Sequence, residues 1–143
     1  MGDVARACLQ GEGGKVELVF KGRLHSEENM VFLDTRTDCA GYFGAGEYCF
    51  MLSGLQRFVR EVTDLQESLR AGEVELSALE DDFSLAIKFG KVGNLEVSTH
   101  HAHGGSTWVN QEFKFFSDQS YAGEFVRELP GMIKTIGSAR EDA

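Results

Sequence analysis

Three of the four histidines, His100, His101 and His103, stand close together directly before two glycines. On a β-strand, residues two apart point to the same face, so His101 and His103 could bind zinc or copper together. His25 or an acid such as Glu112 could supply a further ligand. Histidines beside a Gly-Gly turn are also typical of a solvated hairpin end. His101 and His103 are thus weak candidate metal ligands, and we expect no metal or other cofactor.

A run of carboxylates is the second group that could do chemistry. Between residues 61 and 82 the chain has eight acids and one base, Arg70, which places a net charge of −7 in 22 residues. Such a patch could steer and hold a strongly basic surface, such as the nucleic-acid groove of a nuclease. Alternatively, the acids only form the solvated face of a helix. The candidate partner-binding residues are Glu61, Asp64, Glu67, Glu73 and Glu75.

Sequence motifs for catalysis are absent. There is no GxSxG, and the three cysteines have neither CxxC spacing nor a base that the sequence assigns to them. The triplet Glu80-Asp81-Asp82 is typical of a solvated turn before a strand. The glycine clusters in GEGG, from Gly11, and GYFGAG, from Gly41, do not follow a strand and open a long helix, as a phosphate-binding loop requires. We therefore expect a protein that is not an enzyme.

The length and composition fit one ordinary domain, residues 1–143. The net charge of −9 opposes binding to nucleic acids and anionic membranes, because their phosphates would repel the chain. No segment approaches the roughly 18 to 20 apolar residues of a membrane span. The first residues lack the basic start and apolar run of a signal peptide, so we expect a cytoplasmic protein.

The first half of the chain predicts strands followed by a helix. Residues 1–14 lack periodicity, which indicates a frayed start or a short edge strand. Period-two alternation and β-branched residues predict three strands, in KVELVFKGRL from Lys15, MVFLDTRT from Met30 and CAGYFGAGEYCFM from Cys39.

A helix is predicted from Ser53 to Ala71. Ser53 and Gln56 match a capping box, and Gly72 would supply the left-handed stop. The apolar positions recur at helical spacing and predict a stripe that faces a sheet. They are Leu55, Phe58, Val59, Val62, Leu65 and Leu69.

The alternation in EVELSALEDDFSLAIKF and in LEVST predicts further strands, with residues 83–89 and 95–99 forming a hairpin. For the next hairpin, a two-residue Gly-Gly turn would place apolar residues opposite charges. A three-residue loop would pair Leu95 with Phe113, Val97 with Gln111, and Thr99 with Val109. We prefer the second register.

The segment FKFFSDQSY, from Phe113, joins this last strand to a second helix. Phe113 and Phe115 should lie on the core face, with Phe116 on the other face beneath a loop or helix. Ser117 or Asp118 is suited to cap a helix from Asp118 to about Ile136. Pro130 should kink or break it, and residues 138–143 should form a frayed tail.

The order of these segments resembles a known family. The helix LQRFVREVTDLQESL, the strands EDDFSLAIKFGKVGNLEV and the joint WVNQEFKFFSDQSYAGEFVREL, from Leu55 to about Leu129, are similar to small bacterial WapI-type immunity proteins and to a related family of unknown function. The resemblance implies an α+β domain and the neutralisation of a cognate toxin, often a nuclease. A tryptophan-containing strand, expected in the closest immunity proteins, is missing from residues 15–50, so either family remains open.

The sequence thus predicts an α+β fold, with one antiparallel sheet of about six or seven strands and two helices packed on one face. The leading function is a non-enzymatic protein-binding domain of the immunity type, with a basic protein toxin as its partner. The alternatives are a ligand or metal site at the histidine hairpin, and a structural homodimer built through an exposed edge strand such as Lys15 to Lys21.

Overall fold

Eight strands form two separate antiparallel sheets in the computed structural model, which describes residues 4–104 and 106–142. The first sheet consists, in order, of β1 (Ala5–Gly11), β2 (Gly14–His25), β3 (Met30–Cys39) and β4 (Tyr42–Met51). A short 3-10 helix, Ser26–Glu28, follows β2. The second sheet consists of β5 (Gly72–Ser77), β6 (Phe83–Phe89), β7 (Asn94–His103) and β8 (Val109–Asp118).

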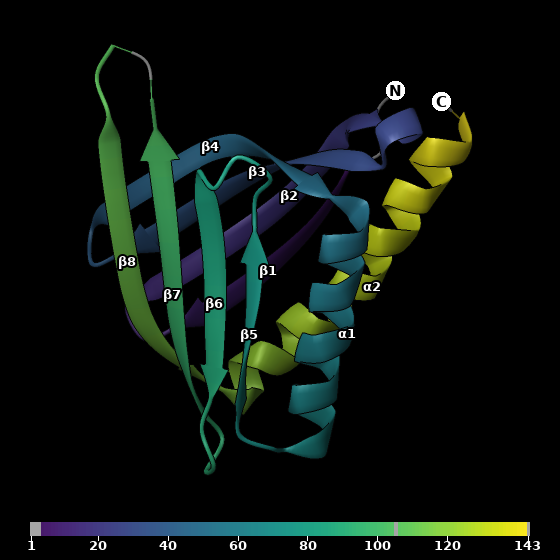
Figure 1. The fold of residues 1–143 in the computed structure, drawn as a ribbon. Coiled ribbons are helices and arrows are strands. Elements are labelled where there is room, and N and C mark those ends of the chain that lie inside the picture. The colour runs from purple at the N-terminus through teal and green to yellow at the C-terminus, as the bar shows by residue number, and fades with distance from the viewer. Residues whose placement is uncertain (1–3, 105, 143) are drawn as a thin grey trace.

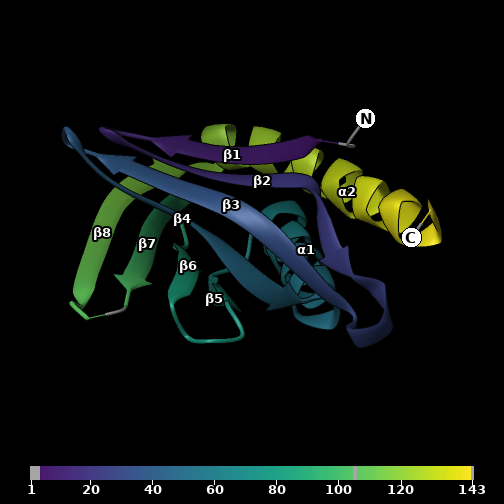
Figure 2. The same cartoon turned by 90° about the horizontal axis from the view of Figure 1, so that it is seen from above.

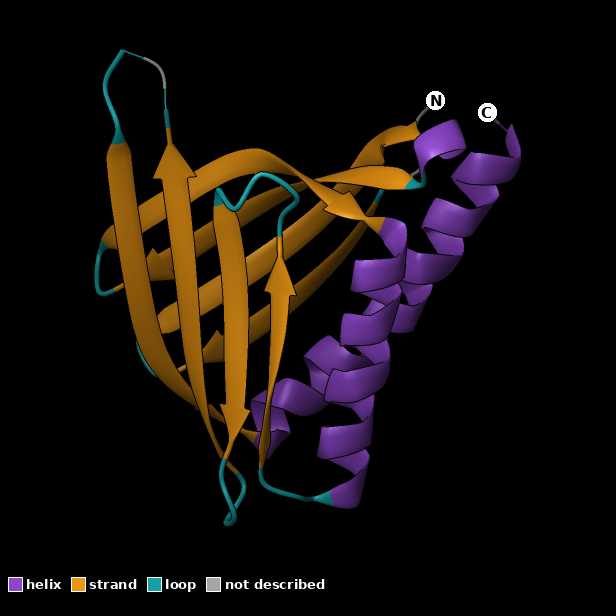
Figure 3. Ribbon diagram, in the orientation of Figure 1, coloured by secondary structure: helices purple, strands orange, loops and turns teal. Residues whose placement is uncertain are grey.

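The two helices lie on one side of the paired sheets (Figures 1 and 3). The chain leaves the first sheet through α1 (Leu52–Ser68), and α2 (Gln119–Asp142) follows the second sheet. In the view from above, α1 lies beneath the first sheet, while α2 runs along β1 (Figure 2). The helices also pack against each other, and the apolar faces of both sheets and both helices contribute to one core.

The α+β class is confirmed, but the prediction of one sheet with six or seven strands is wrong. Alternation identifies a strand and its buried face, yet it carries no information on which strands share a sheet. The edge-strand prediction for Lys15–Lys21 is also wrong, because β2 is paired with β1 on one side and β3 on the other. The strand at that edge is β1. The two helices were also predicted to pack on one face of a single sheet. Instead they contact different sheets, since α1 packs beside β5 and α2 along β1.

Both predicted ends of α1 need correction. The residue before the helix is Met51, which makes no side-chain cap, and Ser53 already lies in the first turn. The left-handed residue at the C-terminal end is Leu69, with φ of 57° and its N–H donated to the carbonyl of Leu65. Gly72 instead opens β5, and its missing side chain leaves room for the Leu65 methyl groups.

The β7–β8 hairpin has neither of the two registers that the sequence suggested. Val97 pairs with Phe115 and Thr99 with Phe113, because the last paired residues, His103 and Val109, are farther apart in the chain than either predicted turn allows. Gly105, part of the predicted turn, lies outside the described residues. The hairpin predicted for β6 and β7 is confirmed, with Phe89 opposite Leu95.

The joint at the end of β8 connects the sheets and starts α2. Phe115 is in the core, as predicted, but Phe116 is 57% exposed rather than covered. The Glu12 N–H donates to the Phe116 carbonyl at 2.9 Å, which ties β8 to the β1–β2 turn. The Asp118 carboxylate accepts the N–H groups of Ser120 and Tyr121, which confirms the predicted cap.

The second helix is longer than predicted. It continues through Pro130 without a break and reaches Asp142, so residues 138–142 are helical rather than a frayed tail. Residues 1–3 and 143, for which a frayed start and tail were predicted, lie outside the described residues.

Replacing Gly14 with alanine should destabilise the protein. A Cβ at this position would lie 2.6 Å from the Cβ of Phe115, so the first sheet and β8 would have to separate. We expect a loss of about 2 kcal/mol in the free energy of unfolding, measured by urea denaturation. Gly54→Ala is the matched control, because nothing lies near a Cβ there and alanine favours the helix. Equal stability of the two variants would contradict the packing described for Phe115.

Candidate functional site

The candidate acids are held outward by two elements whose opposite faces are buried. In α1, Leu55, Phe58 and Val62 lie in the core, so the helical period turns Glu61, Asp64 and Glu67 to solvent. In β5, Val74 and Leu76 are buried, and strand alternation exposes Glu73 and Glu75. All five predicted residues are therefore exposed on α1 and β5.

Three of the five acids line one groove between α1 and β5. Glu61 and Asp64 come from the helix and Glu73 from the strand, and we call this the acidic groove. Its volume is about 200 Å³. Glu67 and Glu75 are exposed on the same two elements but do not line it. The remaining lining residues are Leu65, Gly72 and Val74.

The charge of the acidic groove is poorly compensated. Asp64 pairs with Arg70, but Glu61, Glu67 and Glu73 form no ion pair with any described residue. Glu75 accepts a hydrogen bond from the Ser77 hydroxyl at 2.8 Å. Two of the three acids of the acidic groove, Glu61 and Glu73, therefore form no ion pair with a described residue, although Lys88 stands opposite Glu73 on β6.

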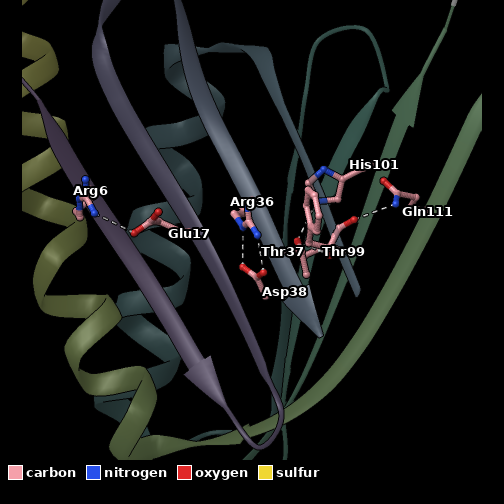
Figure 4. Close-up of polar contacts among 9 residues, drawn as sticks. Arg6, Glu17, Arg36, Thr37, Asp38, Thr99, His101 and Gln111 are labelled. Atoms are coloured by element: carbon pink, nitrogen blue, oxygen red, sulfur yellow. Dashed lines mark hydrogen bonds and ion pairs between the residues drawn. The ribbon is translucent and has the colours of Figure 1, made fainter. Parts of the chain in front are cut away.

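The first sheet shows the opposite arrangement. Among the described residues, it holds four of the six ion pairs, including Arg6–Glu17 at 3.3 Å and Arg36–Asp38 at 2.9 Å (Figure 4). A hollow on this sheet is lined by these charged residues, but their charges largely cancel. Unlike the first sheet, α1 and β5 therefore carry an excess of acidic side chains on their exposed faces.

The count of charges along the sequence began at Glu61, so it missed two bases that lie near the acidic groove. Arg57 and Arg60 line a second hollow one turn earlier on α1, together with residues at the end of β5. Helical spacing could have found them, because Arg57 and Arg60 stand four residues before Glu61 and Asp64. The exposed face of α1 thus changes from basic to acidic along its length.

The histidines of the β7–β8 hairpin do not all lie in solvent, because His101 is 0% exposed. Its Nε2 is 2.8 Å from the Thr37 hydroxyl, and its Nδ1 is 3.0 Å from the Tyr48 hydroxyl. The hydroxyl of Thr37 also lies 2.8 Å from that of Thr99, so the network joins the two sheets (Figure 4). The interpretation of the histidines as a solvated hairpin end is wrong for His101, because β7 continues under the first sheet before it turns.

These contacts argue against the metal site that the sequence allowed. Both ring nitrogens of His101 already have hydrogen-bonding partners, so neither is free to ligate. Glu112 stands opposite His100, on the other face of the sheet from His101. Within the described ranges, no three His, Cys, Asp or Glu side chains are arranged to hold a metal ion.

Protonation of His101 should destabilise the protein as the pH falls. Burial, with a smaller contribution from His103 and His100, lowers the pKa of His101 from 6.5 to about 4. The unfolded chain therefore binds a proton that the folded chain does not, and stability is lost as the pH falls from 6.5 towards 4. The loss should reach about 3 kcal/mol, measured by urea denaturation across this range.

The contribution of His101 is isolated by comparison with His101→Gln, which does not titrate. This variant should lose less stability than the wild type over the same pH range, whereas His25→Gln, at an exposed site, should follow the wild type. Identical pH profiles for the wild type and His101→Gln would show that the network does not require a neutral ring.

Comparison with known proteins adds to this geometry. Neither described helix combines the length and apolarity needed to cross a membrane. A family model described as "Immunity protein WapI-like family" matches residues 8–137. A search of curated proteins gives no match. Because the family match begins within β1 and ends within α2, and so includes both sheets, the chain belongs to the WapI-like immunity protein family.

Proposed function

We propose that the protein neutralises a cationic, nuclease-like toxin by binding it through the acidic groove and the neighbouring acids Glu67 and Glu75. Membership of an immunity protein family supports a toxin-neutralising, protein-binding role, and such families are generally not enzymes. The observation that carries the proposal is the gathering of Glu61, Asp64 and Glu73 in one groove. The cytoplasm, where a nuclease would meet nucleic acid, is the proposed site of action.

The chemistry of such a toxin explains why carboxylates would inhibit it. A nuclease binds phosphates with lysine and arginine side chains, and carboxylates placed against them satisfy the same charges. The net charge of −9 would also accelerate encounter with a basic protein, especially at low ionic strength. Binding would thus block the groove that the nucleic acid needs.

The position of the groove suits a specific interface. Its acids stand on a helix and a strand, whose backbones are more rigid than those of loops. Leu65 and Val74 provide apolar surface between the acids. Arg57 and Arg60, one turn earlier on α1, would repel a cationic partner that docks in the reverse orientation. Charge therefore selects both the partner and its direction.

Reversal of three acids tests the proposal. Glu61→Lys, Glu67→Lys and Glu73→Lys together should abolish protection when the protein is co-expressed with its cognate toxin. Bacterial growth reports protection, and surface plasmon resonance with the purified toxin should show weakening of about a hundredfold or more. The unfolding transition should be preserved, because all three side chains are exposed.

The matched control reverses Glu124, Glu141 and Asp142 on α2, which are also exposed. It changes the net charge by the same amount but leaves the acidic groove intact. If both triple variants lost the same affinity, net charge rather than the groove would control binding. Full protection by the groove variant would exclude the groove as the binding surface.

A further inference from the structure

The two sheets differ in how the acids on their outer faces are paired. Each outward acid of the first sheet forms an ion pair, and these acids are Glu17, Asp34, Asp38 and Glu47. The outward charged residues of β5–β8, apart from the α2 cap Asp118, are Glu73, Glu75, Glu96, Glu112, Lys88 and Lys114. Of these glutamates, only Glu96 forms an ion pair with a described residue, Lys114 at 2.9 Å. A cationic partner would therefore meet unpaired acids on the second sheet and paired ones on the first.

The outer face of the second sheet is uncovered in the described structure. Figures 1 and 2 show this sheet with the first sheet behind it and both helices to one side. On β6, Leu85 and Ile87 are buried in the core, so strand alternation turns Ser84 and Ala86 outward. Glu75 on β5 stands opposite Ala86, and directly paired residues point to the same face. This face is therefore continuous with the β5 side of the acidic groove.

A hollow of about 410 Å³ lies on this outer face, and we call it the serine hollow. Small side chains of β6 and β7 form part of its lining, namely Ser84, Ala86 and Ser98. Ala86 and Ser98 stand opposite each other where the two strands pair. The lining also includes three longer side chains, those of His100, Glu112 and Lys114. Small residues beside longer ones leave room on the sheet for a side chain of a partner.

The charges around the serine hollow leave two acids without a basic partner. Lys114 lines the hollow, but its ammonium is held by Glu96, and Glu112 forms no ion pair with any described residue. Glu75 stands next to Ala86 on the β5 side, whereas Glu112 is on β8. Lys88 is not part of the lining. A cation in the hollow would therefore have a free carboxylate on either side.

The uncharged polar groups of the hollow can also accept hydrogen bonds. The His100 Nε2 lies 3.2 Å from the Asn110 amide oxygen, so a neutral ring donates there and keeps Nδ1 as an acceptor. The hydroxyls of Ser84 and Ser98 have lone pairs as well. A guanidinium has five N–H donors in one plane and no acceptor, whereas an ammonium is a compact, strongly hydrated charge. An arginine therefore suits this set of acceptors better than a lysine does.

We propose that the serine hollow binds an arginine side chain of the cationic partner, with Glu75 and Glu112 on either side of its guanidinium. This inference rests on the proposed function, because it assumes a partner of that charge, and it extends the contact from the acidic groove across the second sheet. Phe116 adds an aromatic ring to the same face, since it stands opposite Glu96 and is 57% exposed. Arginines stack on such rings, as Arg36 does on Phe43 at 4.2 Å.

Other occupants fit this face less well. Two copies of the chain, each with a charge of −9, repel each other. The phosphates of a nucleic acid would be repelled by the same glutamates that favour an arginine. An arginine would also find less on the first sheet, because the acids there already have basic partners.

NMR spectra of the amide groups of the full chain test this inference, with N-acetyl-arginine amide as the probe. The amide signals of Ser84, Ala86 and Ser98 should shift and saturate, with a Kd on the order of 10 mM for so small a ligand. The citrulline analogue has the same shape without the charge, and it should bind about tenfold more weakly. The lysine analogue should also bind more weakly. All titrations are held at one ionic strength, because salt screens the charges.

Ala86→Leu fills the serine hollow without changing any charge. It should remove the saturable shifts, whereas Ala45→Leu, at an exposed position on the outer face of the first sheet, should retain them. Glu112→Gln should weaken binding of the probe by about fivefold, and Glu124→Gln on α2 should not. The urea transition of each variant should match that of the wild type, because all four side chains point away from the core.

Three results would overturn the inference: equal binding of the citrulline analogue, an unchanged response in Ala86→Leu, or the absence of saturable shifts. Shifts of the same amide signals with protein concentration alone would also overturn it, by identifying a second copy as the occupant.

Affinity for the cognate toxin separates this inference from the proposed function. Ala86→Leu should weaken toxin binding by about tenfold or more in surface plasmon resonance, and Ala45→Leu should not. Loss of binding in Ala86→Leu, together with full binding by the triple variant of the acidic groove, would retain the serine hollow and reject the groove. Unchanged toxin binding by Ala86→Leu would reject the serine hollow, whatever the result for the triple variant.

Discussion

The close approach of the two sheets is the constraint on which the rest of this structure depends. β8 can reach the first sheet because glycine stands at the contacts. A Cβ on Gly14 would overlap Phe115, and one on Gly44 would lie 2.8 Å from the Gln111 side chain and 3.0 Å from the Phe113 ring. The glycine backbone lies so close to these side chains that it leaves no room for a side chain of its own. Once the sheets meet here, the helices occupy the remaining side of the core.

The same approach places a polar network between the sheets. His101, Thr37, Tyr48 and Thr99 satisfy one another by hydrogen bonds, so the polar groups are buried at little net cost. The rings of Phe83 and Phe113 lie edge-on to His101 at centroid distances of 5.0 and 6.0 Å. A network with fixed hydrogen-bond directions favours one alignment of the sheets more strongly than apolar packing alone would.

The distribution of charge follows from this arrangement. On the first sheet, cross-strand neighbours bring acids and bases together, as in the pair of Lys21 and Asp34 at 2.6 Å. On α1 and β5, the faces that must leave the core carry acids with few bases close enough to pair. Membership of an immunity protein family gives this imbalance of charge a biological setting.

Local patterns in the sequence determined much of the fold. Alternation located the strands, three- and four-residue spacing identified the buried face of α1, and the cap of α2 was narrowed to Ser117 or Asp118. These features depend on neighbours in the chain, so they can be inferred without coordinates. The exposure of Glu61 and Glu73 followed from the same periodicities, and the order of motifs indicated the family.

Contacts between distant residues were decided only by the tertiary structure. The division into two sheets, the β7–β8 register and the burial of His101 depend on which surfaces meet across the core, and one alternating pattern is compatible with several arrangements. Tertiary contacts also decided where α1 begins and ends. The Leu52 N–H donates to the Asn29 carbonyl, and Leu65 packs against Gly72, so these contacts replace the predicted cap and stop. The convergence of Glu61, Asp64 and Glu73 was likewise beyond the sequence, because periodicity sets the direction of a side chain within its own element and says nothing of the element beside it.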